Sequence, residues 1–125
     1  MKVSVRLAGS ELCRGLVQVV RKDGGVTNLH YHSRVDAIWM GLKGRDKFYQ
    51  PGEVVIGEFG PHEGLSMPRF ARYGFECVSE EDLEIMRVQA FDHAGAKNSG
   101  RTDSAARNPR LTDIGEFKHF SAEVE

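Results

Sequence analysis

The chain has 125 residues, of which 40% are apolar and 28% charged, so it is long enough for one domain around one hydrophobic core. Its 17 lysines and arginines nearly balance its 18 aspartates and glutamates, and the formal net charge of −1 argues against a protein built to bind nucleic acid. No apolar run reaches the length of a membrane span, and the N-terminal stretch has no signal-peptide core, so we expect no membrane partner.

The chain contains two cysteines, Cys13 and Cys77. Two cysteines are too few for the disulfide framework of a small secreted domain, whereas the cytoplasm keeps isolated thiols reduced. We therefore expect free thiols and a cytoplasmic protein.

Short runs with β-type patterning alternate with turn signals over residues 14–91. In chain order the runs are RGLVQVVRK, LHYH, DAIWMGLKG, DKFYQPG, EVVIGEF, LSMPRF, ARYGFECV and LEIMRVQAF. DGG, GPHEG and SEED supply turn signals between them. No segment before residue 92 shows the 3.6-residue periodicity of a helix. Six or seven short strands at this spacing predict an all-β sandwich or barrel.

The composition changes after residue 92. The stretch HAGAKNSGRTDSAARNPRLTD is rich in small and polar residues and offers almost nothing apolar to bury. Beyond it, Ile114, Phe117 and Phe120 follow one another at intervals of three, which suits a helical turn or a short strand. We therefore expect a β-barrel over residues 1–92. Residues 93–125 are then either an arm that wraps the body or a neighbouring subunit, or a flexible tail.

Residues 24–44, GGVTNLHYHSRVDAIWMGLKG, contain a His-x-His pair between two glycines. Gly24 is followed by five residues and then by His30 and His32, and Gly44 closes the stretch. Positions two apart in a strand point to the same face, so both imidazoles face one side. This pattern resembles motif 1 of the cupin superfamily.

Residues 67–88, MPRFARYGFECVSEEDLEIMRV, contain a proline, a Gly-Phe pair and an acidic turn before a last strand. They resemble cupin motif 2, with Pro68 as its proline. The two motifs together span residues 24–88, in the order and separation that cupins have. The resemblance implies a double-stranded β-helix, or jelly-roll barrel, with a pocket inside the barrel and a homodimeric assembly.

The resemblance is incomplete at the metal-ligand positions of the cupin motifs. His30 and His32 occupy two of them, but Ala37 stands at the glutamate position and Tyr73 at the histidine position of motif 2. Two imidazoles alone form a weak site, because divalent metal sites normally have three or four protein ligands. Asp36 would need a β-bulge to turn inward. We therefore expect no cofactor. The less favoured alternative is a divalent metal (Fe, Mn, Ni or Zn) on His30 and His32, with Asp36 or Tyr73 as an extra ligand.

The barrel frame also predicts which residues line the pocket. The expected catalytic residues are His30, His32 and Tyr73, with an imidazole as general base and the phenol as proton donor. The expected substrate-binding residues are Trp39, Gly41, Phe75 and Arg72. Trp39 would form an apolar wall, Gly41 would leave room, and Arg72 would attract an anionic substrate. The structural alternatives are core packing for Trp39 and Tyr73 and a solvated strand edge for Arg72.

Three functions are compatible with this frame, because the fold alone does not select a chemistry. The favoured one is a small-molecule enzyme, metal-free or weakly metal-dependent, that performs acid/base chemistry as an isomerase, epimerase, lyase, dehydratase or cyclase. The second is a metal-dependent oxygenase or lyase with His30 and His32 as ligands. The third is a non-catalytic small-ligand-binding module, which a barrel filled by Trp39, Phe75 and the C-terminal arm would favour.

Overall fold

The computed structural model of the chain describes residues 2–23, 29–94, 98–103 and 118–121. Every regular element in these residues is a β-strand, as the sequence predicts. Among the described residues there is no helix of the length and hydropathy that crossing a membrane requires.

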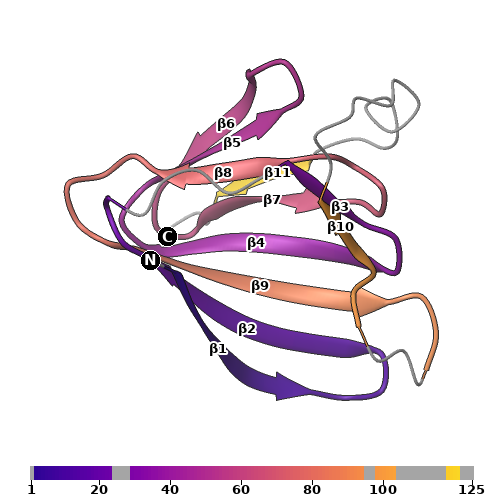
Figure 1. Cartoon of the computed structure of the whole chain (residues 1–125). Helices are drawn as coiled ribbons and strands as arrows, with labels where there is room; N and C mark the ends of the chain where they lie inside the picture. The colour runs from indigo at the N-terminus through magenta and orange to yellow at the C-terminus, as the bar shows by residue number, and fades with distance from the viewer. Residues whose placement is uncertain (1, 24–28, 95–97, 104–117, 122–125) are drawn as a thin grey trace.

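The strands form one large sheet, one small sheet and a two-stranded ribbon (Figure 1). The large sheet contains, in spatial order, β1 (Lys2–Gly9), β2 (Cys13–Val20), β9 (Leu83–Phe91), β4 (Val35–Lys43), β7 (Glu63–Met67) and β11 (Lys118–Ser121). The small sheet contains β6 (Val54–Phe59), β5 (Asp46–Gln50) and β8 (Gly74–Cys77), and the ribbon pairs β10 (Arg101–Asp103) with β3 (His30–His32). All ladders are antiparallel.

Alternation of side chains decides which face of the large sheet is buried. In β4 the buried positions are Val35, Ala37, Trp39 and Gly41, whereas Asp36, Ile38 and Leu42 are exposed. In β9 the buried positions are Leu83, Ile85, Arg87, Gln89 and Phe91. A polar residue on this inner face is therefore buried, although its side chain would prefer contact with water.

The centre of the molecule is an aromatic cluster between the large and the small sheet. Trp39 of β4 lies 5.2 Å from Phe75 of β8, and Phe75 stacks on Phe48 of β5 at 5.1 Å, both measured between ring centroids. Tyr73, just before β8, stacks on Phe48 at 6.0 Å. Each such pair contributes about 0.5–1.5 kcal/mol beyond its buried area, so this cluster holds the two sheets together.

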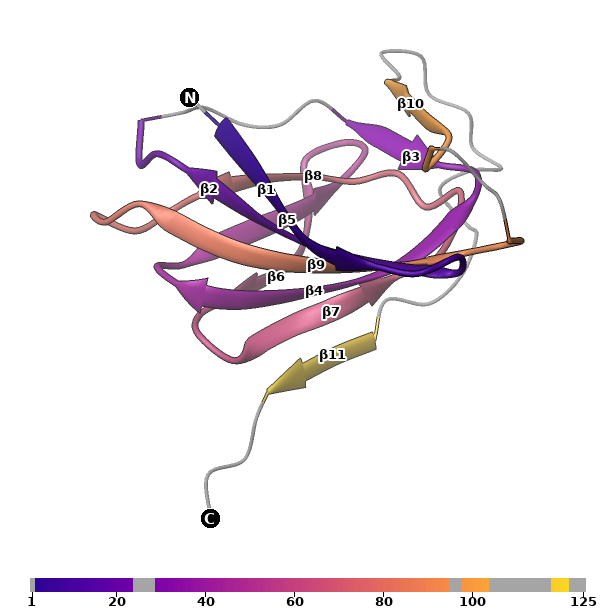
Figure 2. The same cartoon turned by 90° about the horizontal axis from the view of Figure 1, so that it is seen from below.

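Strand β1 lies outside the predicted series, although its sequence KVSVRL alternates polar and apolar residues. Two segments of the C-terminal extension also pair with the body: β10 with β3, and β11 with β7 at the edge of the large sheet (Figure 2). Ile114 and Phe117, which we expected to anchor the extension, lie outside the described residues.

Candidate functional site

Strand β3 brings the two histidines to the interior of the barrel. His30 and His32 are 3% and 5% exposed, and their rings lie 5.1 Å apart, perpendicular to one another. The backbones of His30 and Tyr73 exchange two N–H···O bonds of 3.0 Å. This bridge sets the two side chains opposite one another, with ring centroids 4.4 Å apart. The structure thus brings together the three predicted catalytic residues.

A fourth residue, Arg87, joins them, and the sequence analysis did not select it. Arg87 pairs with Trp39 across β9 and β4, and it is 6% exposed. Its Nη2 atom lies 3.1 Å from Nε2 of His32, and its guanidinium carbon lies 5.2 Å from the centre of a Trp39 ring. The signal was present in the alternation of LEIMRVQAF, which puts Arg87 on the same face as Leu83 and Ile85.

Both ring nitrogens of His32 are engaged. A guanidinium can only donate, so Nε2 of His32 accepts the bond from Arg87, and Nδ1 carries the proton that it donates to Oγ of Ser99 at 2.9 Å. Burial lowers the pKa of His32 to about 2, and the charges of Arg87, His30 and Arg101 add to that effect. His32 is therefore a neutral acceptor that positions Arg87, which leaves His30 as the imidazole for the expected role of general base.

Three buried donors around the Trp39 indole have no acceptor in hydrogen-bond geometry within the part of the chain that the structure describes: Nε1 of Trp39, Oη of Tyr73 and Nε of Arg87. Tyr73 is 0% exposed, and its ring lies 6.2 Å from that of Trp39. Burial raises the pKa of Tyr73, and the charge of Arg87 and the nearby indole N–H of Trp39, which both stabilise the phenolate, oppose this only in part. The phenol consequently keeps its proton at neutral pH and can donate it.

The predicted substrate-binding residues have different places in the structure. Trp39 and Phe75 belong to the aromatic core. Gly41 does not leave room for a ligand, because a Cβ atom there would overlap the carbonyl oxygen of Gly60. Arg72 is buried next to Tyr73, not at a solvated edge.

Asp36 does not join the histidines. It is exposed on the outer face of β4, and its Oδ1 atom accepts a 2.9 Å bond from the backbone N–H of Arg69. The ladder between β4 and β9 is regular from Val35 to Gly41, so the bulge that would turn Asp36 inward is absent there.

The described residues do not fit a divalent metal at the histidine pair. No group of three or more His, Cys, Asp or Glu side chains suited to a metal occurs among them. The Nε2 atom of His32 is bonded to a guanidinium, and a cation beside the two imidazoles would repel a second cation.

No protein-family model and no curated protein matches this sequence. Solved structures do match. An uncharacterized conserved protein with a double-stranded β-helix domain from Klebsiella pneumoniae superposes with a TM-score of 0.69 at 13% identity, covering 84% of this chain and 85% of its own. An RmlC-like cupin from Desulfovibrio desulfuricans gives a TM-score of 0.62 at 20% identity, over 71% and 81% of the two chains.

An oxalate decarboxylase from Lactobacillus farciminis gives a TM-score of 0.59 at 14% identity, over 74% of this chain and 27% of its own. At these identities the matches describe the fold and no more. The chain has the double-stranded β-helix fold of the cupins, which confirms the resemblance seen in the two sequence motifs.

Proposed function

We propose that this chain is a metal-independent cupin enzyme that moves protons on a small organic molecule inside the barrel, as an isomerase, epimerase, lyase, dehydratase or cyclase. The observation that carries the proposal is the Oη atom of Tyr73. It is a buried proton donor for which the described residues provide no acceptor, next to His30 and the guanidinium of Arg87.

The chemistry assigns one role to each group. His30 removes a proton from a carbon beside a carbonyl group. The electron pair of that C–H bond forms a C=C bond, and the π electron pair of the carbonyl moves to its oxygen. Tyr73 donates its proton to that oxygen, which gives a neutral enol and a phenolate. The nearby charge of Arg87 stabilises the phenolate and the developing negative charge on oxygen. The enol O–H then returns its proton to the phenolate of Tyr73 while protonated His30 gives its proton to the same or another carbon, which restores both residues.

Solvent exchange tests this proposal without knowledge of the product. A panel of small carbonyl compounds and hydroxy acids is incubated with the protein in D₂O, and the loss of C–H signals is followed by proton NMR. We expect exchange on at least one compound, and a decrease of at least about 100-fold in Tyr73→Phe. Tyr49→Phe, on β5, is the matched control and retains the rate. Absence of exchange across the panel, or an undiminished rate in Tyr73→Phe, contradicts the proposal.

Metal independence has a separate test. Protein treated with a chelator should keep its exchange rate, and added Fe, Mn, Ni or Zn should not increase it. Stoichiometric metal binding together with restored activity would instead favour the metal-dependent cupin oxygenase or lyase.

One observation favours a non-catalytic ligand-binding module as the second candidate. Trp39 and Phe75 are core residues, and β10 pairs with β3 beside the histidines. Ligand binding without solvent exchange would identify this function.

In either case we place the protein in the cytoplasm, a proposal supported by the free thiols of Cys13 and Cys77.

A further inference from the structure

Arg87 is a buried cation for which the described residues provide no counter-charge. Its one hydrogen-bond partner among them, His32, is neutral. The ion pairs among the described residues involve Arg45, Arg69 and His93, and none involves Arg87. Removal of a guanidinium from water costs several kcal/mol unless an anion compensates it. The described residues therefore offer this guanidinium no negatively charged partner, and a bound anion would supply one.

Several donors around Arg87 lack an acceptor among the described residues. They are the Nε–H of Arg87, the indole N–H of Trp39 and the phenol O–H of Tyr73, all of them buried. Arg101 of β10, which pairs with His32 across the ribbon, is close enough to lower the pKa of that imidazole. A carboxylate has two oxygens with about four acceptor positions, and it matches the planar fork of a guanidinium.

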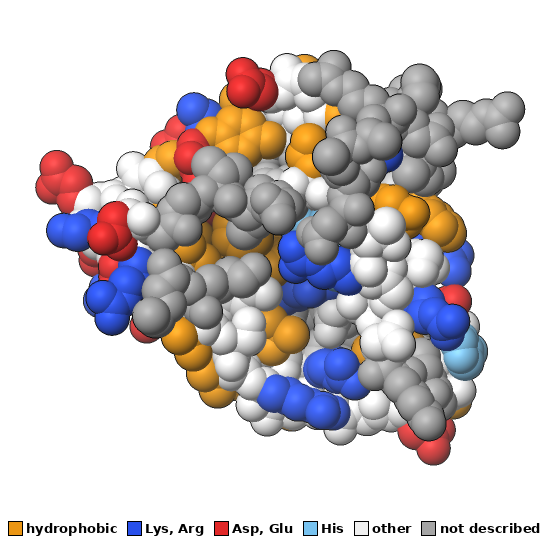
Figure 3. Space-filling model, viewed as in Figure 1, with side chains coloured by type: hydrophobic (Ala, Val, Ile, Leu, Met, Phe, Trp, Pro, Cys, Tyr) orange, Lys and Arg blue, Asp and Glu red, His pale blue; other side chains and the backbone are white. Residues whose placement is uncertain are grey.

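The inner face of the large sheet continues this positive charge beyond Arg87. The pair Arg14–Gln89 lies two positions along the ladder from Leu16–Arg87, so Arg14 is on the same face as Arg87. The Nε atom of Arg14 is also buried without a partner, and its guanidinium lies 5.0 Å from the Phe91 ring. Figure 3 shows Lys and Arg atoms in the middle of the viewed face and Asp and Glu atoms at its margins.

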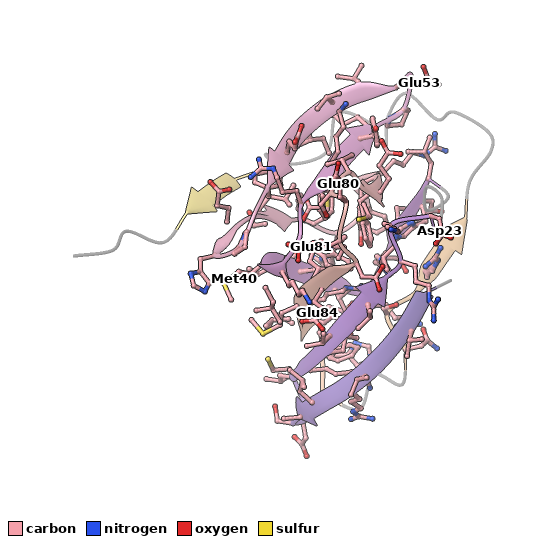
Figure 4. All side chains as sticks on the ribbon, turned by 90° about the vertical axis from the view of Figure 1, so that its left-hand side faces the viewer. Asp23, Met40, Glu53, Glu80, Glu81 and Glu84 are labelled. Carbon is pink, nitrogen blue, oxygen red and sulfur yellow. The ribbon has the colours of Figure 1, made fainter. Side chains whose placement is uncertain are left out.

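The acidic side chains gather elsewhere. Figure 4 shows Glu80, Glu81 and Glu84 around the turn between β8 and β9. Glu84 points to the opposite face of β9 from Arg87, because the two positions differ by an odd number. These three carboxylates thus lie away from the guanidinium.

We infer that the ligand of this site is a small carboxylate, whose carboxyl group Arg87 binds at the place where the resemblance to cupins implies a metal. The inference rests on the proposed function and names its substrate class. Trp39 Nε1 and Tyr73 Oη complete the carboxylate site, and His32 holds the guanidinium in position.

The fluorescence of Trp39 gives a direct measurement, because it is the one tryptophan of the chain and lies against the guanidinium. The full chain is titrated with malonate, with uncharged malonamide and with inorganic phosphate. We expect a saturable change with malonate and none with malonamide. Arg87→Gln should weaken malonate binding at least tenfold, and the exposed Arg69→Gln should not change it.

Equal responses to malonate and malonamide, or unchanged malonate binding in Arg87→Gln, would overturn the inference. Phosphate binding as tight as malonate binding would overturn the assignment to carboxylates. If Arg87→Gln does not fold by circular dichroism, Arg87→Lys replaces it, since lysine keeps the charge but loses the fork; it too should bind malonate at least tenfold more weakly.

This titration requires no turnover, so its outcome is separable from that of the exchange assay. Malonate binding without solvent exchange on any compound would retain the carboxylate site and reject the enzyme. Exchange on a neutral carbonyl compound, with no preference for anions, would retain the enzyme and reject the carboxylate site.

Discussion

Position 87 illustrates how an interior place in a barrel determines the chemistry of the residue that occupies it. On the surface of a strand an arginine is solvated and weakly coupled to its neighbours. On the inner face of β9 the same residue is 6% exposed and hydrogen-bonded to His32. Burial also lowers the pKa of Arg87 below its usual value. The free energy of this charge therefore depends on the few groups that touch it.

The bond from Arg87 to His32 gives the first prediction. His32→Leu removes the acceptor and leaves a buried charged N–H unpaired, so we expect a loss of about 2–3 kcal/mol in the free energy of unfolding. His32→Gln keeps an oxygen acceptor, so its loss in the free energy of unfolding should be clearly smaller than that of His32→Leu. Urea unfolding of both variants at pH 7 measures the difference. Equal stability of the two variants would show that the bond to Arg87 has no energetic role.

The buried carboxyl of Asp46 gives a prediction about pH. Asp46 is 1% exposed, and its Oδ1 atom has no hydrogen-bond partner. Burial raises its pKa to about 7, although the charge of Arg45 and a backbone bond from Phe59 oppose the shift. The folded state therefore holds this proton more tightly than the unfolded chain, whose carboxyl has a pKa near 3.8. The stabilisation that comes from this proton on Asp46 is complete below about pH 4 and is lost as the pH rises to 7 and beyond.

Since one pKa unit corresponds to about 1.4 kcal/mol, the loss between pH 4 and pH 8 is on the order of 4 kcal/mol. His32 acts in the opposite direction, because its imidazole becomes protonated in the unfolded chain below pH 6.5 and not in the folded one. The comparison of wild type with Asp46→Asn isolates the carboxyl. We expect Asp46→Asn to gain stability over wild type as the pH rises from 5 to 8, measured by urea unfolding. A pH-independent difference would contradict the assignment.

At the scale of elements, the ribbon of β3 and β10 fixes the histidine pair from outside the two sheets. Ser99 binds the Nδ1 atom of His32, and the backbone carbonyl of Gly100 accepts a 3.2 Å bond from the N–H of Ser33. Gly100 has a φ of +68°, and a Cβ atom there would overlap Oγ of Ser33. The ribbon thus depends on a glycine at this position.

Gly100→Ala should shift the ribbon and lower the free energy of unfolding by about 1–2 kcal/mol, through strain in the left-handed region and the clash with Ser33. Gly15→Ala on β2 is the matched control, because a Cβ atom at Gly15 meets nothing within 4 Å. NMR chemical shifts of the His32 imidazole and thermal unfolding report the two effects. Unchanged His32 signals in Gly100→Ala would show that the ribbon does not position the site.

At the scale of the whole molecule, the outer face of the large sheet presents apolar side chains to solvent. Val5 and Ile38 are about half exposed. Register places Val5 in one row with Val17, Met86 and Met40, and Met40 is visible in Figure 4. Exposed apolar patches on this scale are typical of interfaces. They support the homodimer that the cupin resemblance implies, which we retain as a proposal.

The dimer prediction is tested by a charge on this face. Ile38→Glu should convert the protein to a monomer at micromolar concentration, because a carboxylate would be buried in the interface without a partner. Val54→Glu on β6, outside the large sheet, serves as the control. Sedimentation velocity measures the mass of each. A monomeric wild type, or a dimer that survives Ile38→Glu, would refute an interface on this face.

The sequence by itself determined the fold class and most of the strands. The runs between residues 14 and 91 each overlap an observed strand, because β-type alternation and turn residues act locally and are readable one segment at a time. It also placed His30 and His32 on one inner face and Tyr73 beside them. The predicted turn GPHEG was too long, since β7 begins at Glu63.

Only the tertiary structure decided what these residues do. The partner of His32 is Arg87, 55 residues away in the chain, and no local pattern connects them. The space beside Gly41 is filled by the backbone of Gly60, and Asp36 faces outward because β4 has no bulge next to it. Local sequence fixes which face a side chain occupies, but the charge and hydrogen bonds that it meets there come from strands that only folding brings together.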